Sequence, residues 1–260
     1  MQISTLLGIV VGIVTICMGM IFKGAHLSAL VNPAAIIIIF VGTAAALLNA
    51  FPMHQFTKMG TMFKVLLKKT EFPEIKDVAR QFVRLSQIAR KEGLLSLEKT
   101  ANEMNDVFMR TGLSMVVDGI EPAIIDEVLE SQIEALKQRH KLGAQLFAQA
   151  GMYAPTLGVL GAVIGLVAAL GNLNDINKLG HSIAAAFIAT MYGIFTGYVL
   201  WHPFANKLKQ LTLEEVEVKQ MMIQGILALQ AGDPPAVMQS KMVSYVPDNE
   251  KDELLKEWAR

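Results

Sequence analysis

Apolar and charged positions alternate along this chain in long blocks. Four stretches lack Asp, Glu, Lys and Arg altogether, and each contains a strongly apolar segment. These stretches are residues 1–22, 24–57, 142–174 and 179–206. About 20 consecutive apolar residues cross a bilayer as an α-helix, and a soluble domain does not need charge-free runs of this length. The pattern therefore predicts an all-α, polytopic membrane protein with four transmembrane helices.

Prolines and polar residues set the expected ends of these helices. Pro33 suits the first turn of the second helix, where its missing N–H costs nothing, and Pro52 ends that helix. Pro155 stands inside the third span and predicts a kink, whereas Pro203 is expected to end the fourth span. The expected spans are Ile3–Phe22, Pro33–Phe51, Phe147–Leu170 and His181–His202.

The segment between the second and third spans, residues 53–147, is too long for a simple connector. Apolar residues recur there at the spacing of one helix face, and charges fill the gaps. Gly93, Gly112 and Gly119 are turn signals that divide the region. We therefore expect a compact helical subdomain. Its two predicted long helices contain Ile75, Val78, Ala79, Phe82, Val83 and Leu85, and then Ile124, Ile125, Val128, Leu129, Ile133 and Leu136.

The fourth span is expected to continue as a helix through Leu229, until Ala-Gly-Asp-Pro-Pro at 231–235 breaks it. A short helix and a charged tail at 248–260 follow. The chain thus divides into two spans, a helical loop, two further spans, and a helical extension with its tail. The boundaries of these four segments are 1–52, 53–146, 147–203 and 204–260.

The formal net charge is zero, but the charges are unevenly distributed. Of the 23 Lys and Arg residues, 14 lie in residues 53–147 and seven follow residue 203. Positive charges near the ends of membrane helices favour the cytoplasmic side. The loop, the C-terminal extension and both termini are therefore predicted to be cytoplasmic.

The interiors of the four spans contain no Asp, Glu, Lys or Arg. Proteins that carry protons or cations usually bind the ion at an intramembrane carboxylate. This chain alone therefore lacks the expected ion-binding group, and a partner helix would have to donate it. Thr156 and Thr190 are the candidates to line an ion path. The competing interpretation is that each hydroxyl bonds the backbone of its own helix.

Glycines at four-residue spacing allow close approach of helices. Such pairs indicate either packing within one subunit or assembly around other membrane helices, and the sequence leaves both open. The pairs are Gly8 and Gly12, Gly161 and Gly165, and Gly193 and Gly197.

Motifs of enzymes and metal sites are missing from the sequence. There is no G-x-S-x-G, no H-E-x-x-H and no Walker sequence. The single cysteine, Cys17, lies in the first span, and the five histidines lack metal-ligand spacing. Basic residues of the loop alternate with acidic ones, which argues against nucleic-acid binding. We predict no enzyme activity, no cofactor and no resident metal.

Several motifs follow one another in a characteristic order. Tyr153–Gly158, followed by Gly161 and Gly165, stands in the third span, and Asn32–Ala35 precedes the second. The remaining motifs are Ala89–Glu98 in the loop and, in the fourth span, His181–Ile183, Thr190, Gly193 and Trp201–Pro203. Together these motifs resemble the MotA family of flagellar stator proteins, which belongs to the MotA/TolQ/ExbB proton channel superfamily.

The resemblance implies a pentamer around a dimer of the single-span protein MotB, in the bacterial inner membrane. The MotB helix would supply the ion-binding aspartate, and its protonation would change the packing of the ring through Pro155 and Pro203. The loop would then push the rotor protein FliG. Arg90 and Glu98 match the two charged rotor-contact positions of the family. On one helix, eight residues would place them about 80° apart around the axis.

The transported ion follows from a single position. Sodium-type members of the family carry a threonine where this chain has Ala162. Alanine offers no oxygen to a partly dehydrated sodium ion, so protons are expected. Two alternatives remain: an ExbB/TolQ-type energy transducer, which has three spans and a differently placed loop, and a small-solute transporter, which the absence of internal charges disfavours.

Overall fold

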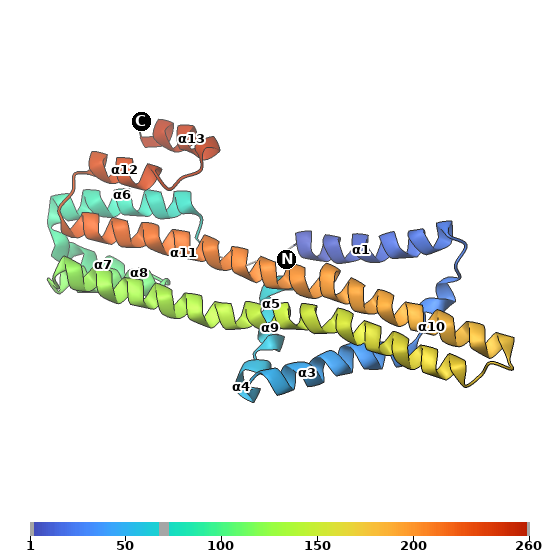
Figure 1. The fold of residues 1–260 in the computed structure, drawn as a ribbon. Helices are drawn as coiled ribbons and strands as arrows, with labels where there is room; N and C mark the ends of the chain where they lie inside the picture. Colours follow the sequence, from blue (N-terminus) through green and yellow to red (C-terminus); the bar gives the residue numbers. More distant parts are fainter. Residues whose placement is uncertain (1–2, 68–72, 259–260) are drawn as a thin grey trace. The chain divides into compact units, whose positions relative to one another are not determined.

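The computed structural model describes residues 3–67 and 73–258, and every regular element in this part of the chain is helical (Figure 1). The helices form two compact units. The membrane unit contains the described residues up to Leu67 together with His140–Gln210. The loop unit contains the described residues from 73 to Arg139 and those from Leu211 onward. The loop and the C-terminal extension, which the sequence analysis separated, therefore contribute to one unit.

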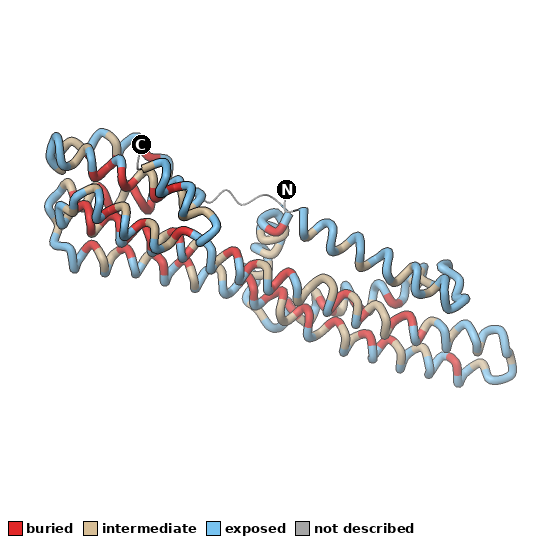
Figure 2. The backbone as a smooth tube through the Cα atoms, turned by 90° about the horizontal axis from the view of Figure 1, so that it is seen from above, coloured by how far each residue is buried: buried red, intermediate tan, exposed pale blue. Residues whose placement is uncertain are grey.

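The first two spans of the membrane unit have the expected ends. Helix α1 covers Ile3–Phe22 and has no buried residue, as its exposed colouring in Figure 2 shows. The second span begins at Pro33, and the Asn32 side chain caps it by accepting a hydrogen bond from Ala35 N at 3.1 Å. Within this span, an α-helical hydrogen-bond pattern changes to a π-helical one and back. The elements from α1 to the loop are η1 (Leu27–Leu30), α2 (Pro33–Ile36), η2 (Ile37–Val41), α3 (Gly42–Ala50), α4 (Met53–Phe56) and α5 (Met59–Leu67).

The third span is longer than predicted. Helix α9 runs without interruption from Pro122 to Leu170, so the expected second loop helix and the expected third span are one element. Residues 137–147 offer no proline to stop it. The single glycine in this stretch, Gly143, packs against the Met62 side chain instead of forming a turn.

The helix of the fourth span begins earlier than predicted and continues past Pro203. Helix α10 (Ile176–Phe195) starts after Asp175, whose carboxylate accepts a hydrogen bond from Lys178 N at 3.1 Å. A π-helical segment, η4 (Thr196–Trp201), leads directly into α11 (His202–Gln230).

Pro203 is the second residue of α11, inside a helix that continues past it. A proline within an α-helix removes one donor and clashes with the carbonyl four residues earlier. The wider π-turn of η4, directly before Pro203, relieves this conflict locally. The helix then continues to Gln230, as the sequence analysis expected from its apolar pattern.

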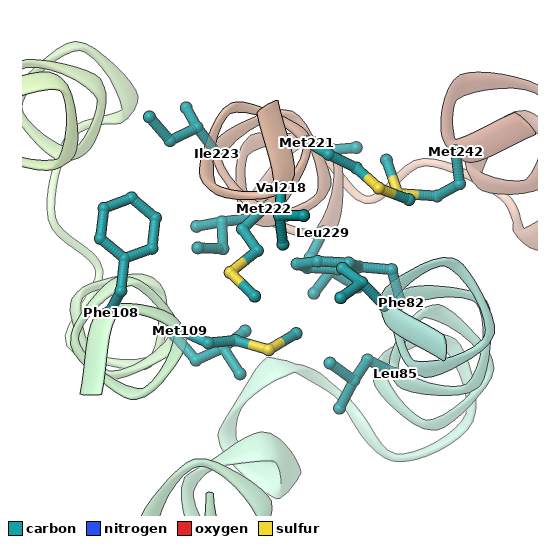
Figure 3. Packing of buried hydrophobic residues seen from close by; sticks show 14 of the residues in the cluster. Phe82, Leu85, Phe108, Met109, Val218, Met221, Met222, Ile223, Leu229 and Met242 are labelled. Atoms are coloured by element: carbon teal, nitrogen blue, oxygen red, sulfur yellow. The ribbon is translucent and has the colours of Figure 1, made fainter. Parts of the chain in front are cut away.

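The loop unit is built around one large apolar core. Phe82 of α6, Met109 of α8 and Met222 of α11 converge there (Figure 3). The N-terminal part of α9 adds Leu129 and Ile133, both fully buried. The elements of this unit besides α9 and α11 are α6 (Ile75–Glu92), η3 (Leu94–Ser96), α7 (Leu97–Glu103), α8 (Val107–Val117), α12 (Pro235–Val243) and α13 (Asp248–Trp258).

Two of the three predicted glycine turns are confirmed. Gly93 and Gly119 have φ angles of 84° and 71°, a region that favours glycine, and each follows the end of a helix. Gly112 does not form a turn, because it lies inside α8. A Cβ atom at Gly112 would collide with the Ile226 side chain, so this glycine serves close helix packing.

Candidate ion path and rotor-contact site

Helices α9 and α10 approach each other along their glycines. A Cβ atom added to Gly158 would lie 2.9 Å from the Ala189 carbonyl oxygen and 2.9 Å from Gly193 Cα. One added to Gly193 would lie 2.6 Å from the Ala154 carbonyl oxygen. Because these neighbours are backbone atoms, they cannot move aside as a flexible side chain can. Both glycines therefore hold the third and fourth spans in contact within one chain.

The remaining predicted glycines continue this interface. Added Cβ atoms at Gly161 and Gly165 would lie 2.9 and 2.8 Å from the methyl groups of Ala189 and Ala186. By contrast, Gly8 has no atom within 4 Å of such a Cβ. Of the two interpretations of the glycine pairs, packing within the subunit thus applies to the glycines of α9, α10 and η4. It also applies to Gly12, where an added Cβ atom would lie 2.7 Å from Val199 Cγ1.

Pro155 lies against the π-helical segment. A Cβ atom added to Gly197 of η4 would be 2.8 Å from Pro155 Cγ and 2.9 Å from the Gly151 carbonyl oxygen. Two residues beyond η4 stands Pro203, which is exposed. Both prolines that were predicted to couple ion binding to motion therefore lie next to η4. Pro155 packs against it, and Pro203 follows it closely in the sequence.

Trp201 anchors the other end of η4 in an aromatic cluster. Its ring stacks on Phe147 with a centroid distance of 6.1 Å, and Phe63 and Phe204 contact both rings edge-on. This cluster was not predicted, because Phe63 is far from the other three in sequence. It positions the junction between η4 and α11 next to Pro203.

The threonine hydroxyls bond within their own helices. Thr156 donates to the Met152 carbonyl at 3.3 Å and Thr190 to the Ala186 carbonyl at 3.4 Å. Thr156 is exposed, and Ala162 and Thr190 are half-buried. No hydrogen bond joins the two hydroxyls among the described residues, so a single copy contains no continuous polar path through them.

Thr190 nevertheless lines a cavity that the sequence did not reveal. The cavity has a volume of about 560 Å³ and lies between α1 and the α10–η4 segment. Its lining is mostly apolar, with Thr15 and Thr190 adding hydroxyls. The residues of the lining come from positions far apart along the chain, and only the packing of α1 brings them together.

Two hydrogen bonds tie the segment before the second span to α10. Tyr192 donates its hydroxyl hydrogen to the Leu30 carbonyl, and Asn32 Nδ2 donates to the Ala185 carbonyl at 3.4 Å. In the sequence, Asn32 stands out only as part of the Asn32–Ala35 motif. Its side chain both caps α2 and contacts α10, so it connects two spans.

Arg90 and Glu98 lie on different helices. Arg90 is in the last turn of α6 and Glu98 in the first turn of α7, with Gly93 and η3 between them. The angle of about 80° for a single helix therefore does not apply. Both side chains are exposed, and neither has an ion-pair partner in the described part of the chain.

Comparison with known proteins identifies the family. The model of the MotA/TolQ/ExbB proton channel family matches residues 100–221, and that of the motility protein A N-terminal region matches residues 6–93. Motility protein A of Bacillus subtilis (strain 168) is 47% identical over 251 residues, which cover 96% of this chain and 93% of the relative. This chain belongs to the motility protein A family.

Solved structures agree with this assignment. A chain from the flagellar MotAB stator complex of Bacillus subtilis matches with a TM-score of 0.91 and 46% identity over 96% of this chain and 98% of its own length. A chain from C. jejuni MotAB matches with the same TM-score, 28% identity, and 95% and 97% coverage. As a member of the motility protein A family, the chain is a multi-pass membrane protein of the stator type rather than an ExbB/TolQ-type transducer or a small-solute transporter.

Proposed function

We propose that this chain is the ring-forming subunit of a flagellar stator, which with a MotB-type single-span partner conducts protons and converts their flow into torque. One observation carries the proposal. Four membrane spans without an internal Asp, Glu, Lys or Arg belong to a chain whose relatives were solved as MotAB complexes. Such a chain needs a carboxylate from a second protein in order to bind an ion.

Five copies surround a MotB dimer in the bacterial inner membrane in this proposal. Both chain termini and the loop unit lie in the cytoplasm, because the Lys and Arg residues concentrate there. A hydrogen bond between Lys207 Nζ and Ser4 Oγ, 2.7 Å long, supports this topology. It keeps the beginning of α1 and the beginning of α11 on the same side of the membrane.

In this proposal, the contact of Pro155 with η4 couples ion binding at the MotB aspartate to movement of the helices. Neutralising the MotB aspartate changes the electrostatic free energy beside these helices. One elementary charge crossing 100 mV releases about 2.3 kcal/mol, which is enough to shift a two-state equilibrium by more than tenfold. π-helical turns are frequent at functional sites and at kinks of helices, and η4 lies next to Pro203.

Protons are the transported ion in this proposal, because Ala162 brings no side-chain oxygen to the third span. The test is to measure the swimming speed of the wild type at several sodium concentrations and at fixed pH. Wild-type swimming speed is expected to be independent of sodium concentration at fixed pH and to fall when the proton gradient collapses. Speed that follows sodium concentration in the wild type would contradict proton transport.

Arg90 and Glu98 contact the rotor protein FliG through complementary charge. Both side chains are exposed, and neither has an ion-pair partner among the described residues, which supports this role. Charge reversal at either position is expected to impair swimming, and a compensating reversal on FliG to restore part of it. Full motility with both charges reversed against the unchanged rotor would refute this contact.

The decisive experiment is complementation of a strain that lacks its own stator. The strain receives this chain with or without its single-span partner, and swimming is measured before and after an uncoupler. We expect swimming only with both proteins and only with a proton gradient. Co-purification of the two proteins in membranes without any swimming would refute the stator function.

A further inference from the structure

The turn between α6 and α7 directs three leucines in different directions. Leu97 is completely buried, and Leu94 is half-buried against the core of the loop unit. Leu95, between them, is 74% exposed. Single exposed apolar residues are common on protein surfaces, so exposure alone does not indicate a function. The fixed conformation of the turn around Leu95, however, does indicate one.

The conformation of the turn is strongly determined. Gly93 has a φ of 84°, a conformation that other residues rarely adopt. The Ser96 hydroxyl donates to the Gly93 carbonyl at 2.6 Å and closes the turn, while Leu94 and Leu97 anchor it in the core. Because the backbone is held on both sides, Leu95 is presented outward at little further cost in conformational entropy upon binding.

Charges of both signs border Leu95. Arg90 and Lys91 lie in the last turn of α6 on one side, and Glu98 lies in the first turn of α7 on the other. None of these three has an ion-pair partner in the described part of the chain. An apolar residue bordered by charged side chains fits the general layout of a protein–protein interface, in which polar residues surround an apolar core.

We propose that Leu95 is the apolar centre of the contact with the rotor. The inference rests on the proposed stator function and adds to it the residue that carries most of the binding free energy. The partner surface would offer an apolar pocket for Leu95, with an acidic group facing Arg90 and a basic group facing Glu98. Under this proposal the charges of Arg90 and Glu98 orient the two proteins, and burial of Leu95 stabilises the complex.

Site-directed labelling tests the proposal directly. The chain has one cysteine, Cys17 in α1, so a Cys17→Ala, Leu95→Cys variant carries a single thiol at the proposed contact. The stator complex with its MotB-type partner is placed in lipid nanodiscs, and the rate of reaction with a charged maleimide is measured with and without FliG. The matched control is Leu255→Cys in the same background, at a leucine of α13 that is 47% exposed.

We expect FliG to slow labelling at position 95 about tenfold or more under saturating conditions, and to leave labelling at 255 unchanged. Equal rates at position 95 with and without FliG would overturn the proposal. A thiol at 95 that is already unreactive without FliG would also overturn it, because the residue would then be buried between copies of this chain.

A second variant keeps the proposal testable through function. Leu95→Ser is expected to weaken FliG binding about tenfold, equal to about 1.4 kcal/mol, and to reduce torque at high load. Proton conductance and melting temperature of the Leu95→Ser variant should not change. A Leu95→Met variant, which keeps an apolar side chain, should retain the torque of the wild type. If Leu95→Ser swims normally while Arg90 and Glu98 reversals stop swimming, this inference fails and the stator function stands. If the wild-type chain fails complementation, the stator function itself fails.

Discussion

The interface of α9 with α10 and the core of the loop unit are packed in opposite ways. Gly158, Gly193 and Ala189 bring two helix backbones into contact in the membrane unit. Phe82 and Met222 fill the loop unit with large side chains (Figure 3). In lipid, burial of an apolar side chain gains little, so close van der Waals contact between small residues stabilises helix pairs. In water, removal of large apolar surfaces from solvent dominates.

The polar groups of the two units differ for the same reason. Thr156, Thr190 and Thr196 of the membrane unit donate to carbonyls of their own helices, because no water is present to accept these hydrogen bonds. In the loop unit, Arg80 instead forms an ion pair on the surface, between α6 and α13. Four changes would break or sharpen this contrast.

The largest effect is expected from Phe82→Ala. Phe82 is completely buried in the core of the loop unit, and removal of a buried phenylalanine costs about 3–5 kcal/mol. Hydrogen exchange of the purified stator complex should accelerate in peptides of α6, α8 and α12. Leu213→Ala, at a residue that is 60% exposed, is the control. Unchanged exchange in Phe82→Ala would show that this core does not stabilise the loop unit.

Gly193→Ala comes next. The new methyl group would lie 2.6 Å from the Ala154 carbonyl oxygen, so α9 and α10 have to separate, at a cost of about 1–3 kcal/mol. We expect a lower melting temperature in detergent and weaker swimming. Gly8→Ala makes the same chemical change where no atom lies within 4 Å, and it should be neutral. Equal behaviour of the two variants would contradict packing through small residues.

A smaller effect is expected from Glu257→Gln. Arg80 Nε and Nη2 donate to the Glu257 carboxylate at 3.0 and 2.8 Å, but both side chains are about a third or more exposed. Solvent screening limits such a pair to about 0.2–1 kcal/mol. The change should increase hydrogen exchange in α13, and high salt should remove the difference from the wild type. Asp252→Asn, at an exposed acid of the same helix, is the matched control.

The smallest effect concerns acid pH at the start of α13. Lys251 Nζ donates to Asp248 at 2.7 Å, and this bond lowers the pKa of the Asp248 carboxyl below its ordinary value of 3.8. The ionised carboxylate therefore stabilises the folded helix at pH above that value. The stabilisation is lost as the pH falls through the lower pKa of the folded state.

Fluorescence can follow this titration. The chain has two tryptophans, so Trp258 of α13 reports alone in a Trp201→Phe variant. An acid-induced change in its emission should be smaller when Asp248→Asn is added, and Asp252→Asn should leave the change intact. An identical titration with and without Asp248 would exclude its contribution.

Much of the fold could be predicted from local pattern. Pro33 and Phe51 were correctly placed at the ends of the second span, because proline geometry is a local property. Gly93 and Gly119 were correctly predicted as turns for a similar reason. Gly112 was misread, since a glycine required for close packing and a glycine required for a turn look alike without the neighbouring helices.

The candidate sites were predicted in part. The sequence supplied Pro155, Thr190, Arg90 and Glu98 as residues, but not their partners. The contact of Pro155 with η4 and the cavity lined by Thr190 depend on side-by-side helices. Leu95 was overlooked because three leucines in four positions look equally apolar in sequence.

The sequence by itself determined the number of spans and their chemistry, and it predicted that an ion-binding carboxylate would come from a partner. These properties depend on hydrophobicity summed over about 20 residues, which does not require knowledge of contacts. Only the tertiary structure decided that α9 joins the loop to the third span without a break, that a π-turn precedes Pro203, and that Arg90 and Glu98 lie on separate helices around Leu95. Helix ends and exposed faces depend on which distant residues pack against each segment, and that information arises only when the chain folds.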